Sequence, residues 1–212
     1  KQPWYPGETV SVSIGQGAVA VTPMALAMFA TTIANGGTLY EPNLVKEVFD
    51  GKEWKPVERP EPRAVTPMDP EHVKAIHEGM WMVVNAAGTG GRERMEGYDV
   101  AGKTGTAQAN ISLENRRRLS GEAARRFRDH GLWIFYAPQA KPEVSGAVFA
   151  ENAEHGYLGA PIAKYVLETY FAKKEGRPLP TLTPAAPTVP TAPTATVPTA
   201  ATGATAPTTG SR

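Results

Sequence analysis

The stretch GYDVAGKTGTAQ, at residues 97–108, combines a lysine, two threonines and several glycines, residue types that bind anions and carbonyl groups. Its first eight residues fit the spacing G-x-x-x-x-G-K-T, a loop that holds nucleotide phosphates on its backbone N–H groups. Lys103, Thr104 and Gly105 also spell K-T-G, which is typical of a strand that lines an active site. The two interpretations need different structures, so the flanking sequence decides between them.

The flanks argue against a phosphate-binding loop. Such a loop needs a buried strand before its first glycine and a helix that begins at its lysine. The residues before Gly97 read GTGGRERME, which is polar and rich in glycine. Gly105 is unfavourable in the first turn of a helix, and Tyr98 to Val100 favour extended backbone. The nucleotide interpretation therefore fails on both sides.

The K-T-G interpretation predicts an extended strand with small residues, along whose edge a substrate could lie. Ala101, Gly102, Gly105 and Ala107 surround Lys103 and supply such residues. A triplet of this kind also arises by chance, so the motif alone only suggests a site.

Composition narrows the class of function. The chain has 212 residues, 22 Lys and Arg against 21 Asp and Glu, and a net charge of +1. This balance gives no reason to expect a nucleic-acid partner. The absence of cysteine excludes disulfides, thiol catalysis and zinc sites with cysteine ligands, and leaves the compartment open. No apolar run is long enough to span a bilayer, and the chain begins at Lys1, so we expect a fragment of a longer protein.

The C-terminal part differs in composition from the rest. Residues 183–209 are nearly all Thr, Pro or Ala, which cannot bury enough apolar surface to offset the entropy lost on folding. We predict one folded portion at residues 1–176 and a disordered tail at 177–212.

Helix signals occur at three places. Thr22-Pro23 is a good start for a helix that ends at Gly36-Gly37, and its apolar sequence predicts burial all round. Asp69-Pro70 starts an amphipathic helix over 70–85. A closing helix ends near Gly176. We predict that Ile162, Tyr165, Val166 and Tyr170 line one face of this helix.

Three segments have the residue types of strands, at residues 98–108, 132–138 and 143–151, and the turn-like QAKP joins the last two. Because these strands follow one another with no parallel crossover, the sequence predicts an α+β fold, an antiparallel sheet flanked by helices.

Other chemically tempting residues have simpler explanations. His72 and His77 lie five residues apart and do not share a helix face, so we predict no metal site and no cofactor. Glu151 and Glu154 are expected to be ordinary strand-end and loop charges. Residues 114–129 hold six arginines and three acids and predict one solvated amphipathic helix, with contact to an anionic glycan or lipid headgroup as the alternative.

Longer segments resemble a known family. WYPGETVSVSIGQGAVAVTPMALAMFATTIANGG is similar to the segment after the second active-site motif of class B penicillin-binding proteins. KTGTAQ resembles their third motif, and HGLWIFYAPQAKPEVSGAVFAEN with GAPIAKYVLETY resembles their last strand pair and final helix. The resemblance covers most of residues 1–175 in order and best fits the penicillin-binding protein 2 type that serves cell elongation and cell shape.

This resemblance implies the fold of transpeptidases and serine β-lactamases, and a D,D-transpeptidase that cross-links peptidoglycan stem peptides through a serine acyl-enzyme and binds β-lactams. It implies that Lys103 keeps the site electropositive and helps proton transfer, and that the hydroxyls of Thr104 and Thr106 bind the substrate carboxylate. The N–H of Thr106 would supply half of the oxyanion hole. Gly105 would keep the strand edge open, and Gln108 would be a further substrate contact.

One departure from the family pattern is large. No serine in the chain has a lysine three residues later, and none has Asn or Asp two residues later. We therefore expect this chain to be the C-terminal part of a transpeptidase domain that begins after the second motif, and to be inactive alone. The alternative is a non-catalytic peptidoglycan-binding or scaffold module with a transpeptidase-like fold.

The resemblance also implies a location and partners for the parent protein. It would be held by one N-terminal membrane helix, with this domain on the extracytoplasmic face of the cytoplasmic membrane. It would act with a membrane glycosyltransferase that polymerises glycan strands and with the rest of the elongation machinery.

Overall fold

The computed structural model describes residues 3–109 and 111–181. The chain divides into two units, Lys1–Pro180 and Thr181–Arg212, and the fold below is that of the first. Most of the predicted disordered tail, residues 182–212, lies outside the described residues. In the described part, no helix combines the length and apolar character needed to cross a membrane.

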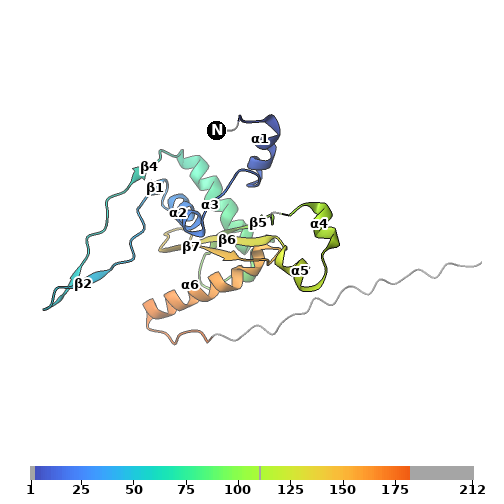
Figure 1. The fold of residues 1–212 in the computed structure, drawn as a ribbon. Helices are drawn as coiled ribbons and strands as arrows, with labels where there is room; N and C mark the ends of the chain where they lie inside the picture. Colours follow the sequence, from blue (N-terminus) through green and yellow to red (C-terminus); the bar gives the residue numbers. More distant parts are fainter. Residues whose placement is uncertain (1–2, 110, 182–212) are drawn as a thin grey trace, which may run out of the picture. The chain divides into compact units, whose positions relative to one another are not determined.

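A three-stranded antiparallel sheet forms the centre of the first unit (Figure 1). Its strands are β5 (Ala101–Ala107), β6 (His130–Ala137) and β7 (Val144–Ala150), in the order β5-β6-β7. The pairing places Lys103 opposite Ile134. The prediction of an antiparallel sheet made from these three segments is confirmed.

Three predicted helices also form. They are α2 (Pro23–Ala34), α3 (Pro70–Asn85) and α6 (Ala160–Glu175). The Thr22 hydroxyl accepts a hydrogen bond from the N–H of Ala25 at 3.1 Å, so the predicted start of α2 is correct. The α6 helix ends at Gly176, whose φ of 67° is the left-handed conformation that glycine adopts most easily.

The two faces of the sheet carry separate cores, with α6 on one side and α2 on the other, and α3 contributes Val84 to the first core and Met80 to the second (Figure 1). Trp133 and Phe135 point from β6 toward α6, where they meet Leu167. Ile134 and Tyr136 point the opposite way. The strand alternation therefore supports helices on both faces, as the α+β prediction requires.

The apolar face predicted for α6 is not the face that packs on the sheet. Ile162 and Val166 are 54% and 46% exposed, whereas Ala163, Leu167 and Phe171 are buried against the sheet. Both helix faces contain apolar residues, and the small side chains of the alanine-bearing face let the helix approach the strands closely. The fit of the side chains against the sheet therefore determines which face of α6 is buried, and hydrophobicity alone does not.

The prediction that α2 is buried all round is also wrong. Its Ala30 and Ile33 are buried, but Met24 and Phe29 are 51% and 55% exposed. The helix packs one side on β6 and β7, and within the described residues its other side remains open to solvent.

Several elements were not predicted. The helix α1 (Pro6–Ser13) buries none of its residues. Residues 38–65 form an arm of two antiparallel ladders. The arm pairs β1 (Thr38–Leu39) with β4 (Ala64–Val65) and β2 (Glu47–Phe49) with β3 (Trp54–Pro56). Two short 3₁₀ turns, η1 (Gly91–Glu93) and η2 (Gly156–Leu158), flank the sheet.

The single arginine-rich helix predicted for residues 114–129 is wrong. The segment forms two short helices, α4 (Leu113–Arg118) and α5 (Gly121–Arg126). The chain is extended at Ser120, and the φ of Gly121 is 58°, so the helical backbone is interrupted between them. The periodicity of the apolar residues did not reveal this break.

Candidate active site

The K-T-G residues lie on an edge strand. Because the sheet order is β5-β6-β7, one side of β5 has no partner strand among the described residues. Side chains alternate along a strand, so Thr104 and Thr106 share the face directed toward α6, and Lys103 and Gly105 occupy the other. An extended backbone through Lys103 is incompatible with a helix that begins there, so the nucleotide-loop interpretation is excluded by the fold as well.

The indole of Trp133 packs against β5 on the face of the sheet directed toward α6. Trp133 is fully buried, and it lies opposite Thr104 in the neighbouring strand. A Cβ atom on Gly102 would stand 2.3 Å from its Cζ2 atom, and one on Gly90 would stand 2.4 Å from Cη2. The ring therefore fills space that only glycines leave free, directly beneath the residue that precedes Lys103.

Lys103 and Thr104 place a cation and a hydroxyl next to each other at an accessible position. Lys103 is exposed, and its Nζ donates a hydrogen bond to the carbonyl oxygen of Thr104 at 2.7 Å. The Oγ1 atom of Thr104 lies 2.8 Å from the Oγ1 atom of Thr89, which comes from the loop after α3. Sequence reasoning missed Thr89, because nothing in its local sequence indicates contact with a strand fifteen residues later.

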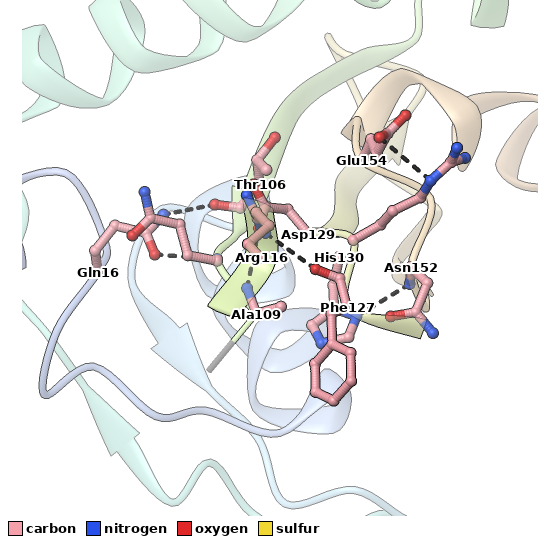
Figure 2. A network of polar contacts seen from close by, with 11 residues as sticks. Gln16, Thr106, Ala109, Arg116, Phe127, Asp129, His130, Asn152 and Glu154 are labelled. Carbon is pink, nitrogen blue, oxygen red and sulfur yellow. Dashed lines mark hydrogen bonds and ion pairs between the residues drawn. The ribbon is translucent and has the colours of Figure 1, made fainter. Parts of the chain in front are cut away.

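Gln16 contacts the far end of the same strand. Its Nε2 donates to the carbonyl oxygen of Thr106 at 2.6 Å, and its Oε1 accepts from the backbone N–H of Gln108 at 3.3 Å (Figure 2). Sequence reasoning did not single out Gln16. Its available signal was the position between Gly15 and Gly17, which both have left-handed φ values, of 73° and 67°.

The contact with Gln16 shows which way the Thr106 backbone points. In a strand, the N–H and C=O of one residue point to the same side, and successive residues alternate. Because the Thr106 carbonyl oxygen meets Gln16 outside the sheet, the Thr106 N–H also points to the outer edge. Gly105, one residue earlier, directs its polar groups inward to β6.

Glu93 is a buried carboxyl group behind the site. It has no exposed surface, and neither its oxygens nor the indole N–H of Trp133 has a hydrogen-bond partner of normal geometry among the described residues. Burial raises the pKa of Glu93 to about 8, while the indole of Trp133 and the charge of Lys164 act in the opposite direction. The protonated acid is therefore the favoured form at pH 7.

A polar network holds the chain where it leaves β5 (Figure 2). The Asp129 carboxylate accepts from the N–H of Ala109 at 3.0 Å and pairs with the guanidinium of Arg116, which also donates to the Phe127 carbonyl oxygen at 3.1 Å. The hydrogen bond from Arg116 lowers the pKa of Asp129. The network ties the segment after β5 to the residue that precedes β6.

The same network limits the predicted role of the arginines. Arg116 is engaged internally with Asp129, so it is less available to an external anion. Arg118 and Arg126 form surface pairs, with Glu114 at 2.5 Å and with Glu122 at 2.7 Å. Contact between this segment and an anionic glycan or lipid headgroup stays a prediction.

The remaining candidates have structural roles. His77 makes a hydrogen bond through Nε2 to the carbonyl oxygen of Ile33 at 2.9 Å, at the end of α2. Across the described residues, no cluster of three or more His, Asp or Glu side chains could hold a metal ion. The Ser145 hydroxyl lies on β7, 2.6 Å from that of Thr31.

Comparisons with known proteins bear on the family. Residues 1–168 match the family described as the penicillin-binding protein transpeptidase domain. The chain is 36% identical to the peptidoglycan D,D-transpeptidase MrdA of Acinetobacter baumannii over 180 residues, which is 84% of this chain and 26% of that protein. It is 30% identical to MrdA of Escherichia coli K12 over 198 residues, which is 87% of this chain and 30% of that protein. The chain thus spans roughly a quarter to a third of the curated relatives it matches.

Solved structures agree with this match. Penicillin-binding protein 2 of Pseudomonas aeruginosa, in complex with WCK 5153, superposes with a TM-score of 0.64 at 34% identity, covering 83% of this chain and 35% of that one. Penicillin-binding protein A of M. tuberculosis, as an imipenem acyl-enzyme complex, gives a TM-score of 0.56 at 29% identity, covering 74% and 33%. The chain belongs to the penicillin-binding protein transpeptidase family, as a class B member of the penicillin-binding protein 2 type.

Proposed function

We propose that this chain forms the K-T-G wall of the active site of a peptidoglycan D,D-transpeptidase, and that its nucleophile lies elsewhere in a longer protein. The observation that carries the proposal is the open edge of β5. Along this edge the strand presents the outward N–H of Thr106, with Lys103 on one face of the strand and Thr104 and Thr106 on the other. The absence of an S-x-x-K sequence supports the placement of the nucleophile outside this chain.

The proposed reaction is acyl transfer between stem peptides. A serine hydroxyl attacks the penultimate D-Ala carbonyl carbon, the peptide C–N bond breaks, and the terminal D-Ala leaves with the proton that the serine lost. The amine of a second stem peptide then attacks the ester, which forms a new amide and returns the proton to the serine. A β-lactam enters the same first step, but its leaving nitrogen stays attached to the opened ring.

Each residue of the edge has a proposed task in that chemistry. The Lys103 ammonium keeps the site electropositive and assists proton transfer. The hydroxyls of Thr104 and Thr106 bind the substrate carboxylate, and the Thr106 N–H donates to the developing oxyanion, a contact worth roughly 3 kcal/mol of barrier. Gly105 keeps side chains off the edge where the peptide pairs, and Gln108 contacts the substrate at its end.

We further propose the setting of the longer protein. It faces the extracytoplasmic side of the bacterial cytoplasmic membrane, anchored by a segment outside this chain. It works beside a membrane glycosyltransferase that supplies new glycan strands, within the elongation machinery.

A fluorescent penicillin tests this proposal. The full-length protein that contains this chain should become covalently labelled, and the 212-residue chain alone should not. In the full-length protein, Lys103→Met should slow labelling strongly, roughly a hundredfold, by the usual size of effects in such sites. The matched control is Lys52→Met, in the arm, which should label at the wild-type rate.

Three results would count against the proposal. Labelling of the isolated chain would show that it contains its own nucleophile. Failure of the full-length protein to label would favour the non-catalytic scaffold instead. Equal labelling of Lys103→Met and Lys52→Met would remove Lys103 from the site.

A further inference from the structure

Gln16 joins two distant parts of the chain at the candidate site. The residue lies in the loop after α1, ninety positions before Thr106. Its side-chain amide donates to one backbone group of β5 and accepts from another two residues further on. This is the pattern of two hydrogen bonds that a single residue of a neighbouring parallel strand would make.

The backbone groups on the outer edge of β5 differ in whether they have a hydrogen-bond partner among the described residues. The Thr104 carbonyl oxygen accepts from Lys103, the Thr106 carbonyl oxygen accepts from Gln16, and the Gln108 N–H donates to Gln16. On the same edge, the Thr106 N–H lies between the carbonyl oxygens of Thr104 and Thr106. It points outward and is flanked on its C-terminal side by groups that Gln16 holds.

We propose that Gln16 is a positioning residue for acyl transfer, which acts through β5 and does not touch the substrate itself. Its amide fixes the peptide planes on the C-terminal side of Thr106 and so keeps the Thr106 N–H directed at the substrate carbonyl. This inference rests on the proposed function, because it assigns a purpose to the same oxyanion donor. It adds a residue from outside the K-T-G strand to the machinery of the site.

The chemistry explains why glutamine suits this position. The contact needs one donor and one acceptor at a fixed separation, and a primary amide supplies both. A carboxylate could accept from Gln108 but would repel the Thr106 carbonyl oxygen. A protonated carboxylic acid restores the donor, and methionine keeps the length of the side chain without either hydrogen bond.

The test uses the full-length protein and measures acylation by a β-lactam, separated into the affinity of the first complex and the rate of acylation. We expect Gln16→Met to lower the acylation rate roughly tenfold or more, by analogy with other displaced catalytic groups, and to leave the affinity within about twofold. The matched control is Gln139→Met, whose side chain makes no hydrogen bond in the part of the chain that the structure describes.

A second variant gives a signature that a purely structural role would not produce. For Gln16→Glu, the acylation rate relative to wild type should rise as the pH falls from about 7 to about 5, because the acid regains a donor as it protonates. The charged and titratable groups near this contact, Lys103, Arg116, Asp129 and His130, are present in both proteins, so a change in the ratio with pH reports the residue at position 16.

The outcomes separate this inference from the proposed function. A wild-type protein that is not acylated at all would overturn the proposed function. A wild-type protein that is acylated, together with unchanged acylation of Gln16→Met, would overturn only the role of Gln16. If Gln16→Met fails to fold, a relative rate for Gln16→Glu that stays flat with pH would overturn that role by itself.

Discussion

The central sheet and the arm at residues 38–65 are both antiparallel, yet they are stabilised in different ways. In the sheet, β6 is covered on both faces, and its Trp133 is fully buried. In the arm, every residue of the β2–β3 ladder is exposed, and Trp54 is 66% exposed. The K-T-G strand belongs to the first kind, which suits a site whose groups must keep fixed positions.

The arm is ordered by local contacts. Asp50 accepts hydrogen bonds from the N–H groups of Lys52 and Glu53 at 2.9 and 3.0 Å and pairs with the Lys55 ammonium at 2.6 Å. The rings of Phe49 and Trp54 are in contact at an angle of 47°, with their centres 5.5 Å apart. Strand pairing alone therefore does not make a rigid support, whereas helices packed on both faces of a sheet do.

The largest difference between the two regions is expected when one tryptophan is truncated in each of them. Trp133→Ala removes a buried indole from beneath β5, so the free energy of unfolding should fall by about 3–5 kcal/mol. Trp54→Ala should lower it by less than about 1 kcal/mol, because the side chain is mostly in water already. Urea denaturation measures both, and similar losses would refute the distinction between the two regions.

The buried Glu93 should make the free energy of unfolding depend on pH. Its folded-state pKa of about 8 lies above the ordinary value of 4.5, so the folded state binds the proton more tightly than the unfolded state. Its contribution to stability is therefore complete below about pH 4.5 and is lost as the pH rises through about 8. The slope between these values should approach about 1.4 kcal/mol per pH unit.

Glu93→Gln, which cannot ionise, should flatten that profile, and the variant should gain on the wild type as the pH rises. Chemical denaturation between pH 5 and pH 8 provides the measurement. Parallel profiles for the two proteins would mean that Glu93 is not buried in its protonated form.

A smaller effect than that of Trp133→Ala is expected at the exit of β5. Asp129→Asn removes the charge that pairs with Arg116 and weakens the hydrogen bond from Ala109, so it should cost about 1–2 kcal/mol at pH 7. Because Arg116 lowers the pKa of Asp129, this contribution is present above the ordinary carboxyl pKa and is lost as the pH falls.

The arm offers a control, since Asp50→Asn also removes a paired carboxylate. Asp129→Asn should slow acylation of the full-length protein measurably, and Asp50→Asn should not. A reversed order would mean that the arm, and not the exit of β5, supports the site.

The sequence predicted the elements that local signals define. The caps at Thr22 and Asp69 and the β-prone residue types of the three strand segments were enough to place α2, α3 and the sheet. Choices made by packing were not predictable in this way, and the buried face of α6 is the clearest case, because both faces of the helix carry apolar residues and the alanines of the buried one allow close approach to the sheet.

The residues of the candidate site also fall into two groups, those that the sequence identified and those that only the fold brings together. Lys103, Thr104 and Thr106 were identified because they are consecutive or nearly so, and the motif could be seen in the sequence. Thr89 and Gln16 are connected to these residues only through space. Their types are common and their local sequences indicate turns, so only the folded chain shows what they contact.

The span between Gln16 and Thr106 also has a consequence for the order of folding. The β6–β7 hairpin closes over a short turn, and β5 joins it across a segment of about twenty residues, whereas the Gln16 contact must close a loop of ninety. Loop-closure entropy favours the short-range pairings first. We therefore expect the strand to form with its outer edge bare, and the proposed catalytic groups on it to reach their final alignment only in the last step, when the segment that carries Gln16 meets them.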